Sequence, residues 1–281
     1  MKGLGDYLND SDADDDSKPL WREILEVLLT LLIILTVLQL LLGAHMPVPI
    51  VAVVSCSMIH EDDVIGSISY RFAESVWPVL LEGRCKYDSG NNWRNWVADK
   101  IPEADIDKFP LKSGFSVGDM VLVITPDGAG TVLPIFQQTK VGDVVIYVRD
   151  RRVSGSEPII HRVVGVVDVR EGRVYDVSGT LDCYTQKDFE SKFIPYIKSC
   201  QKGSSGCAYR SFPSGDSFRL YITKGDNNRG TDQCGGILPV TDQQILARGW
   251  IRVPYLGWLK LVLNRVFGLV LGIPFMLLGQ G

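Results

Sequence analysis

The chain has 281 residues, of which 33 are acidic and 29 basic, for a formal net charge of -4. Its 46% hydrophobic content and mean hydropathy of +0.10 exclude a largely disordered chain and a transporter with many membrane spans, and they indicate a globular body with one or two apolar segments. The mild acidity gives no reason to expect nucleic acid as a partner, and six cysteines are too few for a miniprotein built on disulfides.

The N-terminal segment combines a polar tail with a long apolar run. Residues 1–20 are polar and contain an acidic run, which predicts a solvated cytoplasmic tail. Residues 27–44 carry no charge, and as a helix they would extend over about 27 Å, close to the roughly 30 Å of a bilayer core. Trp21 and Arg22 precede the run, as expected at a membrane interface. We therefore predict a transmembrane anchor over residues 21–45.

A removable signal peptide is the alternative interpretation of this run. Its apolar region would be about 7–15 residues long and would end in a small-x-small cleavage site, whereas the Gly-Ala-His-Met sequence at 43–46 is a poor one. Basic residues precede the run at Lys2, Lys18 and Arg22, and the next lysine or arginine after it is Arg71. The positive-inside rule then predicts a cytoplasmic N-terminus and a body outside the cytoplasm, at the cell membrane.

Residues 46–255 form the body, in which several segments are typical of β-strands. The apolar or β-branched runs that predict them are residues 49–54, 117–124, 141–148, 159–167 and 218–223. Two of these runs begin with a Gly-Asp turn, at 118–119 and 142–143. Strands do not alternate with long helical patterns, so we predict a mainly β domain.

Two stretches interrupt the strand pattern and are predicted to be insertions on the β framework. The first is residues 61–116, in which 74–81 and 93–100 are expected to be short helices. The second is residues 181–213, which is rich in cysteine and contains a flexible Gly-Ser loop. The functions of both insertions are left open by the sequence.

The cysteines could form disulfides if the body lies outside the cytoplasm. Cys200 and Cys207 flank the Gly-Ser loop and are predicted to pair. Cys56 is expected to be free. Three cysteines are then left, one of them without a partner, and the alternative that all six are reduced stays open.

The C-terminal segment, 256–281, is mostly apolar but less uniform than the first run. Lys260, Asn264 and Gly268 recur at four-residue spacing and make a weak polar stripe, and Pro274 interrupts the run. The segment is predicted to be either a second transmembrane helix or an amphipathic helix in the membrane interface, and the sequence leaves both open.

Candidate catalytic bases are few, because the chain has only three histidines, His45, His60 and His161. His45 is expected at the membrane boundary, and His161 lies inside a predicted strand. The sequence contains no HxxxH or CxxC pair, and its cysteine spacings do not match a zinc site. We therefore expect no metal and no cofactor.

A serine and two aspartates complete the residue types that a Ser-His-Asp hydrolase needs. Ser57 follows the first predicted strand within a Ser-Cys-Ser-Met sequence. The last predicted strand ends in Thr-Lys-Gly-Asp-Asn-Asn, which contains Asp226, and Asp232 follows six residues later. A serine hydroxyl is a weak nucleophile until a base takes its proton, and histidine suits that role near neutral pH. Spacing alone does not show that these residues meet in space.

Together the boxes resemble signal peptidase I in its archaeal and endoplasmic-reticulum form. That family has an anchor that leads into a strand and a Ser-Gly-Ser-Met-x-Pro box, then Gly-Asp strands, a His-Arg-Val box and a Thr-Lys-Gly-Asp-Asn-Asn box. The matching segments here are residues 55–58, 118–119, 142–143, 161–164 and 223–228. The resemblance implies a signal-peptidase-like antiparallel β domain, built from two small sheets or partial barrels.

The resemblance also implies a role for each matched residue. Ser57 would be the nucleophile, His161 the general base, Asp232 the acid that supports the histidine, and Asp226 a second acid near the site. Which aspartate contacts His161 is left open. The backbone N–H of Ser57 and the hydroxyl of Ser55 would form the oxyanion hole. The implied activity is that of a membrane-anchored serine endopeptidase that removes N-terminal signal peptides from secreted preproteins at Ala-x-Ala-like sites.

Two departures from the family pattern fall close to the nucleophile. Cys56 stands where the family has glycine, and His60 stands where it has proline. We expect His60, in the sequence His-Glu-Asp-Asp, to be a surface histidine, with a second base near the site as the alternative.

The expected partners are the signal peptides of exported preproteins, membrane lipid and, as an open question, secretion machinery. Two alternative functions remain. One is a non-catalytic, membrane-tethered β module for binding or assembly, and the other is a related serine protease with a different substrate, for example one that cleaves pilin-like proteins or itself.

Overall fold

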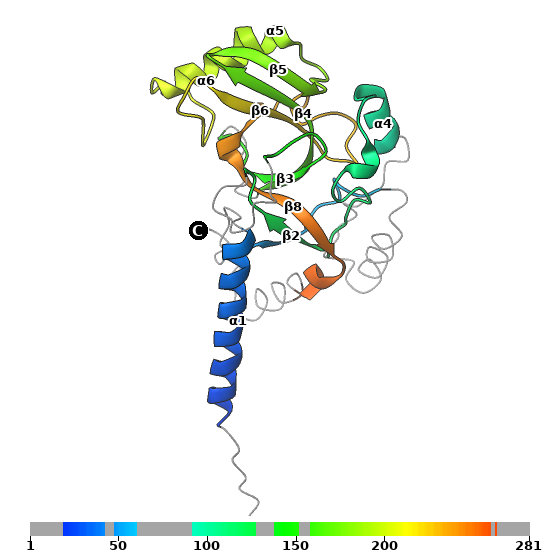
Figure 1. The fold of residues 1–281 in the computed structure, drawn as a ribbon, viewed down its shortest axis with the longest axis vertical. Coiled ribbons are helices and arrows are strands. Elements are labelled where there is room, and N and C mark those ends of the chain that lie inside the picture. The colour runs from blue at the N-terminus through cyan, green and yellow to red at the C-terminus, as the bar shows by residue number, and fades with distance from the viewer. Residues whose placement is uncertain are drawn as a thin grey trace, which may run out of the picture. The chain divides into compact units, whose positions relative to one another are not determined.

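The computed structural model describes residues 19–42, 48–60, 92–127, 138–151, 158–259 and 262 (Figure 1). The chain divides into two units, Met1–Leu38 and Gln39–Gly281. The predictions for the acidic tail, for the helix at 74–81 and for nearly all of the C-terminal apolar segment lie outside the described residues.

The helix α1, Leu20–Leu42, contains most of the predicted anchor. It begins before the uncharged run, and Arg22 and Glu26 form an ion pair one turn apart in its first part. Its large apolar side chains are exposed, and among the described residues it is the one helix long and apolar enough to cross a membrane. A helix that is apolar on all sides belongs in lipid or in a protein core, although a signal sequence near the N-terminus has the same character.

The body contains one antiparallel sheet of eight described strands. Along the sheet lie β1 (Ile50–Ala52), β2 (Met120–Ile124), β8 (Ile245–Val253), β3 (Val144–Tyr147), β4 (Ile159–Arg170), β6 (Phe218–Lys224) and β7 (Val240–Thr241), and β5 (Arg173–Gly179) pairs with β4 beside this path. The predicted mainly β body is confirmed, but it has one continuous sheet in the form of a half-barrel and not two sheets, because β8 pairs with β2 along one edge and with β3 along the other.

The five strands predicted from the sequence are confirmed as β1, β2, β3, β4 and β6. The other three were missed. Most residues of β5 are exposed or half-buried, β7 has two residues, and Arg248, Gly249 and Arg252 interrupt the apolar run of β8. Pairing with neighbouring strands makes these segments β-structure, which a local pattern does not show.

Four register shifts curl the sheet into a half-barrel (Figure 1). They lie between Leu122 and Val123, Ile146 and Tyr147, Val163 and Gly165, and Asp168 and Val169. Such irregularities bend a strand and increase its twist. Near the third shift β4 passes from pairing with β3 to pairing with β5. An added Cβ on Gly165 would lie 2.0 Å from the carbonyl oxygen of Thr180, so only glycine fits this bend.

Helices from both insertions pack against β4 and β6. The helix predicted at 93–100 is confirmed as α4 (Trp93–Lys100), which begins after the N-cap residue Asn92. The second insertion contains α5 (Gln186–Asp188), the π-helical η2 (Phe189–Phe193) and α6 (Ile194–Gln201), and short turns η1 (Ile106–Lys108) and η3 (Asp242–Gln244) lie elsewhere. Apolar side chains of α4, η2 and α6 form one core cluster with those of β4 and β6.

Two disulfides lie wholly within the described residues. Cys200–Cys207 confirms the predicted pair, and Cys183–Cys234 joins the second insertion to the loop that follows β6. Cys56 is also disulfide-bonded, so the expectation that it is free is wrong; its partner lies outside the described residues. The pattern agrees with an oxidising location for the body.

Removal of the Cys183–Cys234 disulfide should destabilise the protein more than removal of Cys200–Cys207. The bonds span 51 and 7 residues, and loop-closure entropy predicts losses of about 4 and about 2.5 kcal/mol in the free energy of unfolding. Chemical denaturation of the two double Cys→Ser variants in detergent measures both losses. Equal losses, or a larger one for Cys200–Cys207, would contradict the prediction.

Candidate active site

His161 and Asp232 form a buried, hydrogen-bonded pair. His161 lies in β4 opposite Val145 of β3, and Asp232 lies in the loop after β6. The Nδ1 atom of His161 is 2.7 Å from Oδ2 of Asp232, and both side chains are buried. Of the two candidate aspartates, the one that contacts His161 is therefore Asp232.

Two hydroxyl groups hold the same carboxylate oxygen from the strands on either side of β4. Tyr147 of β3 donates to Oδ2 of Asp232 at 2.9 Å, and Thr223 of β6 donates to it at 2.6 Å. Burial opposes ionisation of Asp232, but His161 and the two hydroxyls outweigh it, so the pKa of Asp232 lies below its usual value. Burial and the charge of Asp232 raise the pKa of Tyr147 well above its usual value, and its hydroxyl therefore remains a donor.

The hydrogen bond to Asp232 determines the tautomer of His161. An ionised carboxylate can only accept, so the hydrogen lies on Nδ1 and Nε2 keeps its lone pair. Nε2 faces Gly225, where an added Cβ would lie only 2.9 Å from it. A side chain at position 225 would also meet the amide of Asn228, at 2.6 Å, so glycine allows this turn to approach the imidazole closely.

Ser57 lies in the loop after β1 and is half-buried. Its carbonyl oxygen accepts a hydrogen bond from the backbone N–H of Asn227 at 2.7 Å, and the next residue, Met58, is fully buried in the core. The hydroxyl oxygen of Ser57 is 3.3 Å from that of Ser55, which is exposed. Within the described part of the chain, this hydroxyl makes its hydrogen bond with Ser55 and not with His161.

The turn after β6 contacts both His161 and the serine segment, by which we mean residues 55–60. Gly225 faces Nε2 of His161, and two residues later Asn227 binds the backbone of Ser57. The same short turn therefore contacts both the imidazole of His161 and the backbone of Ser57. Hydrogen bonds between a nucleophile and its base are often absent before substrate binds, so the Ser55 contact does not argue against a Ser-His pair.

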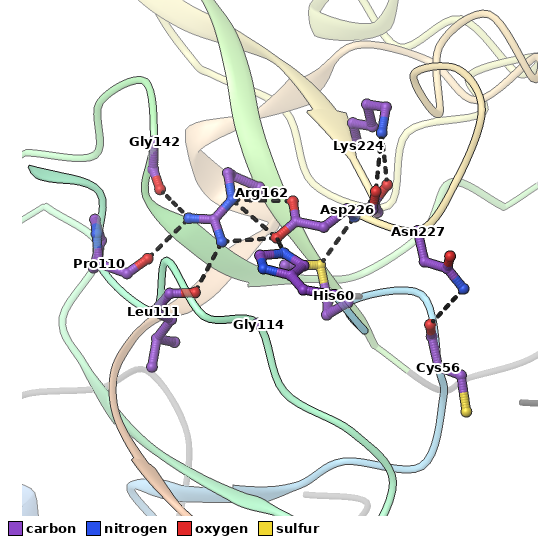
Figure 2. Close-up of polar contacts among 12 residues, drawn as sticks. Cys56, His60, Pro110, Leu111, Gly114, Gly142, Arg162, Lys224, Asp226 and Asn227 are labelled. Carbon is purple, nitrogen blue, oxygen red and sulfur yellow. Dashed lines mark hydrogen bonds and ion pairs between the residues drawn. The ribbon is translucent and has the colours of Figure 1, made fainter. Parts of the chain in front are cut away.

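Asp226 belongs to a different cluster, which gathers around Arg162 (Figure 2). Consecutive residues of a strand point to opposite faces, so Arg162 points away from the side of His161. The guanidinium of Arg162 donates to both carboxylate oxygens of Asp226, at 3.0 and 2.8 Å. It also donates to the carbonyl oxygens of Pro110, Leu111 and Gly142.

His60 joins this cluster and is buried, so the expectation of a surface histidine is wrong. Its Nε2 is 2.7 Å from Oδ2 of Asp226, and 2% of the residue is exposed. The imidazole stacks on Trp93 of α4 with ring centroids 4.5 Å apart. His60 therefore points into the interior, toward an acid and away from solvent.

Two aromatic rings of α4 cover the cations of this cluster. Arg162 and Lys224 are cross-strand partners in β4 and β6, and they lie over Trp93 and Trp96 at 4.9 and 4.8 Å from the ring centroids. Burial lowers the pKa of Lys224 to about 8, although nearby carboxylates, Asp226 first among them, oppose the change. Helix α4 thus gives the first insertion a structural role beside the candidate site.

Asp226 is the counter-charge of Arg162, and its loss should destabilise the fold. Asp226→Asn leaves a buried guanidinium without a carboxylate, which typically costs about 3–5 kcal/mol. Burial opposes ionisation, but Arg162 and His60 hold the pKa of Asp226 well below its usual range. Its stabilisation is therefore present above the unfolded pKa of about 4 and is lost as pH falls through the lower folded pKa.

Denaturant unfolding at pH 7 and pH 4 or lower measures this effect. The gap between wild type and Asp226→Asn should be largest near pH 7 and shrink in acid. Asp168→Asn is the matched control, because Asp168 pairs with Arg219 in a partly exposed position, where such pairs contribute about 0–1 kcal/mol. A gap that grows as the pH falls would contradict the assignment.

Several residues at the site were not predicted. Tyr147 and Trp93 lie in a β-branched run and in a predicted helix, where aromatic residues normally signal only core packing. Thr223 and Gly225 belong to the box around Asp226, but local turn chemistry explains them equally well. No sequence signal could have shown that Tyr147 and Thr223 converge on Asp232, because they lie on two strands that flank a third.

Comparison of the chain with models of protein families, with curated proteins and with solved structures found no match.

Proposed function

We propose that this protein is a membrane-anchored serine endopeptidase of the signal peptidase I type, in the archaeal and endoplasmic-reticulum branch. The observation that carries the proposal is the buried His161–Asp232 pair, whose free Nε2 faces the turn that binds Ser57. A tautomer fixed by a buried carboxylate, beside a serine, is the arrangement that activates a hydroxyl.

In this proposal Ser57 attacks the carbonyl carbon of the scissile peptide bond. Nε2 of His161 takes the hydroxyl proton during the attack and gives it to the leaving amine, and water then hydrolyses the acyl-enzyme with the same histidine as base. Asp232 holds the ring in position and stabilises the imidazolium. The hydroxyl of Ser57 must turn from Ser55 toward His161 for the first step.

The oxyanion would be bound at the start of the serine loop. In the described part of the chain the backbone N–H of Ser57 makes no hydrogen bond, so it is available as a donor. The hydroxyl of Ser55 lies beside it and would be the second donor. Donors that are already oriented stabilise the charge that develops in the transition state.

The substrate would bind as an added strand. Within the described residues β1 pairs with β2 alone, and β1 leads directly to Ser55 and Ser57. An extended segment along this edge would carry a peptide bond to the nucleophile through main-chain hydrogen bonds. The proposed substrate is an apolar signal peptide with a small-residue cleavage site. Its apolar character matches that of the N-terminal helix of the enzyme.

The test is cleavage of a purified preprotein by the full chain in detergent, with the cut located by mass spectrometry. The expected result is one cut after an Ala-x-Ala site and none in a matched preprotein whose last residue before the cut is tryptophan. Absence of any cut in a set of preproteins would favour the non-catalytic module. Cleavage that ignores the tryptophan would favour a protease with a different substrate.

A further inference from the structure

The described part of the chain has two buried His–Asp pairs, and the proposed mechanism uses only one. His161 and Arg162 are consecutive residues of β4 and point to opposite faces, so His161–Asp232 lies on one face and His60–Asp226 on the other with Arg162. Figure 2 shows the second pair. His60 is three residues beyond the candidate nucleophile, yet its ring points to Asp226. It is therefore not the base for Ser57, and its place in the molecule needs another explanation.

The site around His60 fits an imidazole closely. One face of the ring stacks on Trp93, and Gly114 lies against it, where an added Cβ would be 2.8 Å from Cδ2. Nε2 is bound to Asp226, whereas Nδ1 is buried and has no hydrogen-bond partner among the described residues. Among the described residues, Nε2 therefore makes the one polar contact of the His60 ring.

The charges of the cluster indicate the form of His60. The buried guanidinium of Arg162 binds both oxygens of Asp226 and balances its charge, and Lys224 places a second cation nearby, bonded to the carbonyl oxygens of Gly225 and Asp226. A protonated His60 would add a third cation around one carboxylate and bury an unpaired N–H at Nδ1. The geometry therefore places a ring hydrogen on Nε2, where the Asp226 carboxylate accepts it.

The serine segment is attached to Asp226 and Asn227 at four points. The carbonyl oxygens of Cys56 and Ser57 accept from the side chain and the backbone of Asn227, at 3.2 and 2.7 Å. The sulfur of Met58 accepts from the backbone of Asp226 at 3.5 Å, and His60 donates to its carboxylate. Of these four contacts, only that of His60 is made to the carboxylate of Asp226. This carboxylate also binds Arg162, which follows His161 in β4.

We infer that His60 is a positioning residue. Through Asp226 and Arg162 it fixes the position of the serine segment relative to β4, the strand that contains His161. The inference rests on the proposed function, because it assigns His60 the task of keeping Ser57 beside Nε2 of His161. Without this contact the segment can shift relative to β4. A displacement of about 1 Å in a reacting group can lower a rate about 100-fold.

Two substitutions separate hydrogen bonding from packing. His60→Phe keeps a ring against Trp93 and removes the donor, whereas His60→Gln has an amide nitrogen about as far from the backbone as Nε2 and keeps the donor. We expect His60→Phe to lower kcat for preprotein cleavage by about 10- to 100-fold with little change in KM, because no substrate contact is lost. His60→Gln should restore most of this loss. Equal losses in the two variants, or wild-type kcat in His60→Phe, would overturn the inference.

A second measurement does not depend on activity. The chain has only three histidines, so selective ¹⁵N labelling of histidine in the full chain in detergent gives three imidazoles, which substitutions at positions 45, 60 and 161 assign. In wild type, His60 should carry its hydrogen on Nε2 and His161 on Nδ1. In His60→Phe the Nδ1–H signal of His161 should shift or broaden, and in His60→Gln it should stay as in wild type.

The two readouts distinguish failure of the inference from failure of the proposed function. A chain that cleaves no preprotein but shows the expected signals would end the protease proposal and keep the coupling of His60 to His161. A wild-type His60 with its hydrogen on Nδ1, or a His161 signal unchanged in His60→Phe, would overturn the inference even in an active enzyme. If His60→Phe does not fold, substitutions at positions 45 and 161 still assign the wild-type His60 signal by elimination, and a hydrogen on Nδ1 would overturn the inference.

Discussion

Ser57→Ala should abolish cleavage of a preprotein, with a fall in kcat/KM of about 10⁴- to 10⁶-fold. Ser57 is bonded through its backbone to the turn that faces Nε2 of His161, and its hydroxyl lies 3.3 Å from that of Ser55. Without the hydroxyl of Ser57 no acyl-enzyme can form, and the residual rate comes from oriented binding alone. Single-turnover cleavage assays with excess enzyme measure a fall of this size.

Ser55→Ala is the matched control, because it removes the neighbouring hydroxyl and leaves Ser57 in place. Loss of one oxyanion donor lowers kcat by about 100- to 1,000-fold, so its effect should be clearly smaller than that of Ser57→Ala. Thermal unfolding of both variants should match wild type, since Ser55 is exposed and Ser57 half-buried. Full activity in Ser57→Ala would end the serine-protease proposal.

Asp232→Asn should lower kcat by about 10⁴-fold while the fold is retained. The asparagine amide can donate to Nδ1 of His161, which would move the imidazole hydrogen to Nε2 and remove the lone pair that accepts the proton of Ser57. The hydroxyls of Tyr147 and Thr223 donate to the same Oδ2 that contacts His161, so an amide nitrogen at that position would donate to one of them and leave the other without its acceptor. The substitution therefore exchanges donors and acceptors beside His161 while the side chain keeps its shape.

The kinetics of a variant that combines His161→Ala with Asp232→Asn distinguish a changed His161 tautomer from general damage to the fold. His161→Ala should reach the same low rate, and addition of Asp232→Asn should lower it little further, because residues that act as one unit are strongly non-additive. Activity within about tenfold of wild type in both single variants would exclude His161 as the base, since a positioned general base contributes at least about 100-fold. His60 could not then replace it, because its ring is buried against Asp226.

The sequence predicted those parts of the fold that have a strong local pattern. The β-branched runs that became β2, β3 and β4 are apolar over most of their length because the structure buries β3 and most of β4 on both faces and β2 more deeply on one face than on the other. β8 carries arginines and a glycine yet occupies the middle of the sheet, where Arg248 is satisfied by Asp143. Arg248 finds this partner 105 residues away in the chain, and the periodicity of a local segment contains no information about such a contact.

The candidate site was predicted in its residue types but not in its contacts. Asp226 and Asp232 follow the same strand, and only the path of the loop shows that the second one turns back to His161. His60 is followed by three acidic residues, which predicts a surface position, whereas the fold buries it against Asp226 and Trp93. Cys56 next to the nucleophile was expected to be free and is disulfide-bonded.

By itself, then, the sequence determined a charge-free apolar run of 18 residues, a mainly β body and a small set of possible catalytic residues, because these depend on composition and on spacing along the chain. Only the tertiary structure decided that one continuous sheet carries them, and that β4 presents His161 to one acid and Arg162 to another on its opposite faces. The reason is physical: neighbouring side chains on a strand alternate, and their partners come from loops and strands that are far apart in the chain.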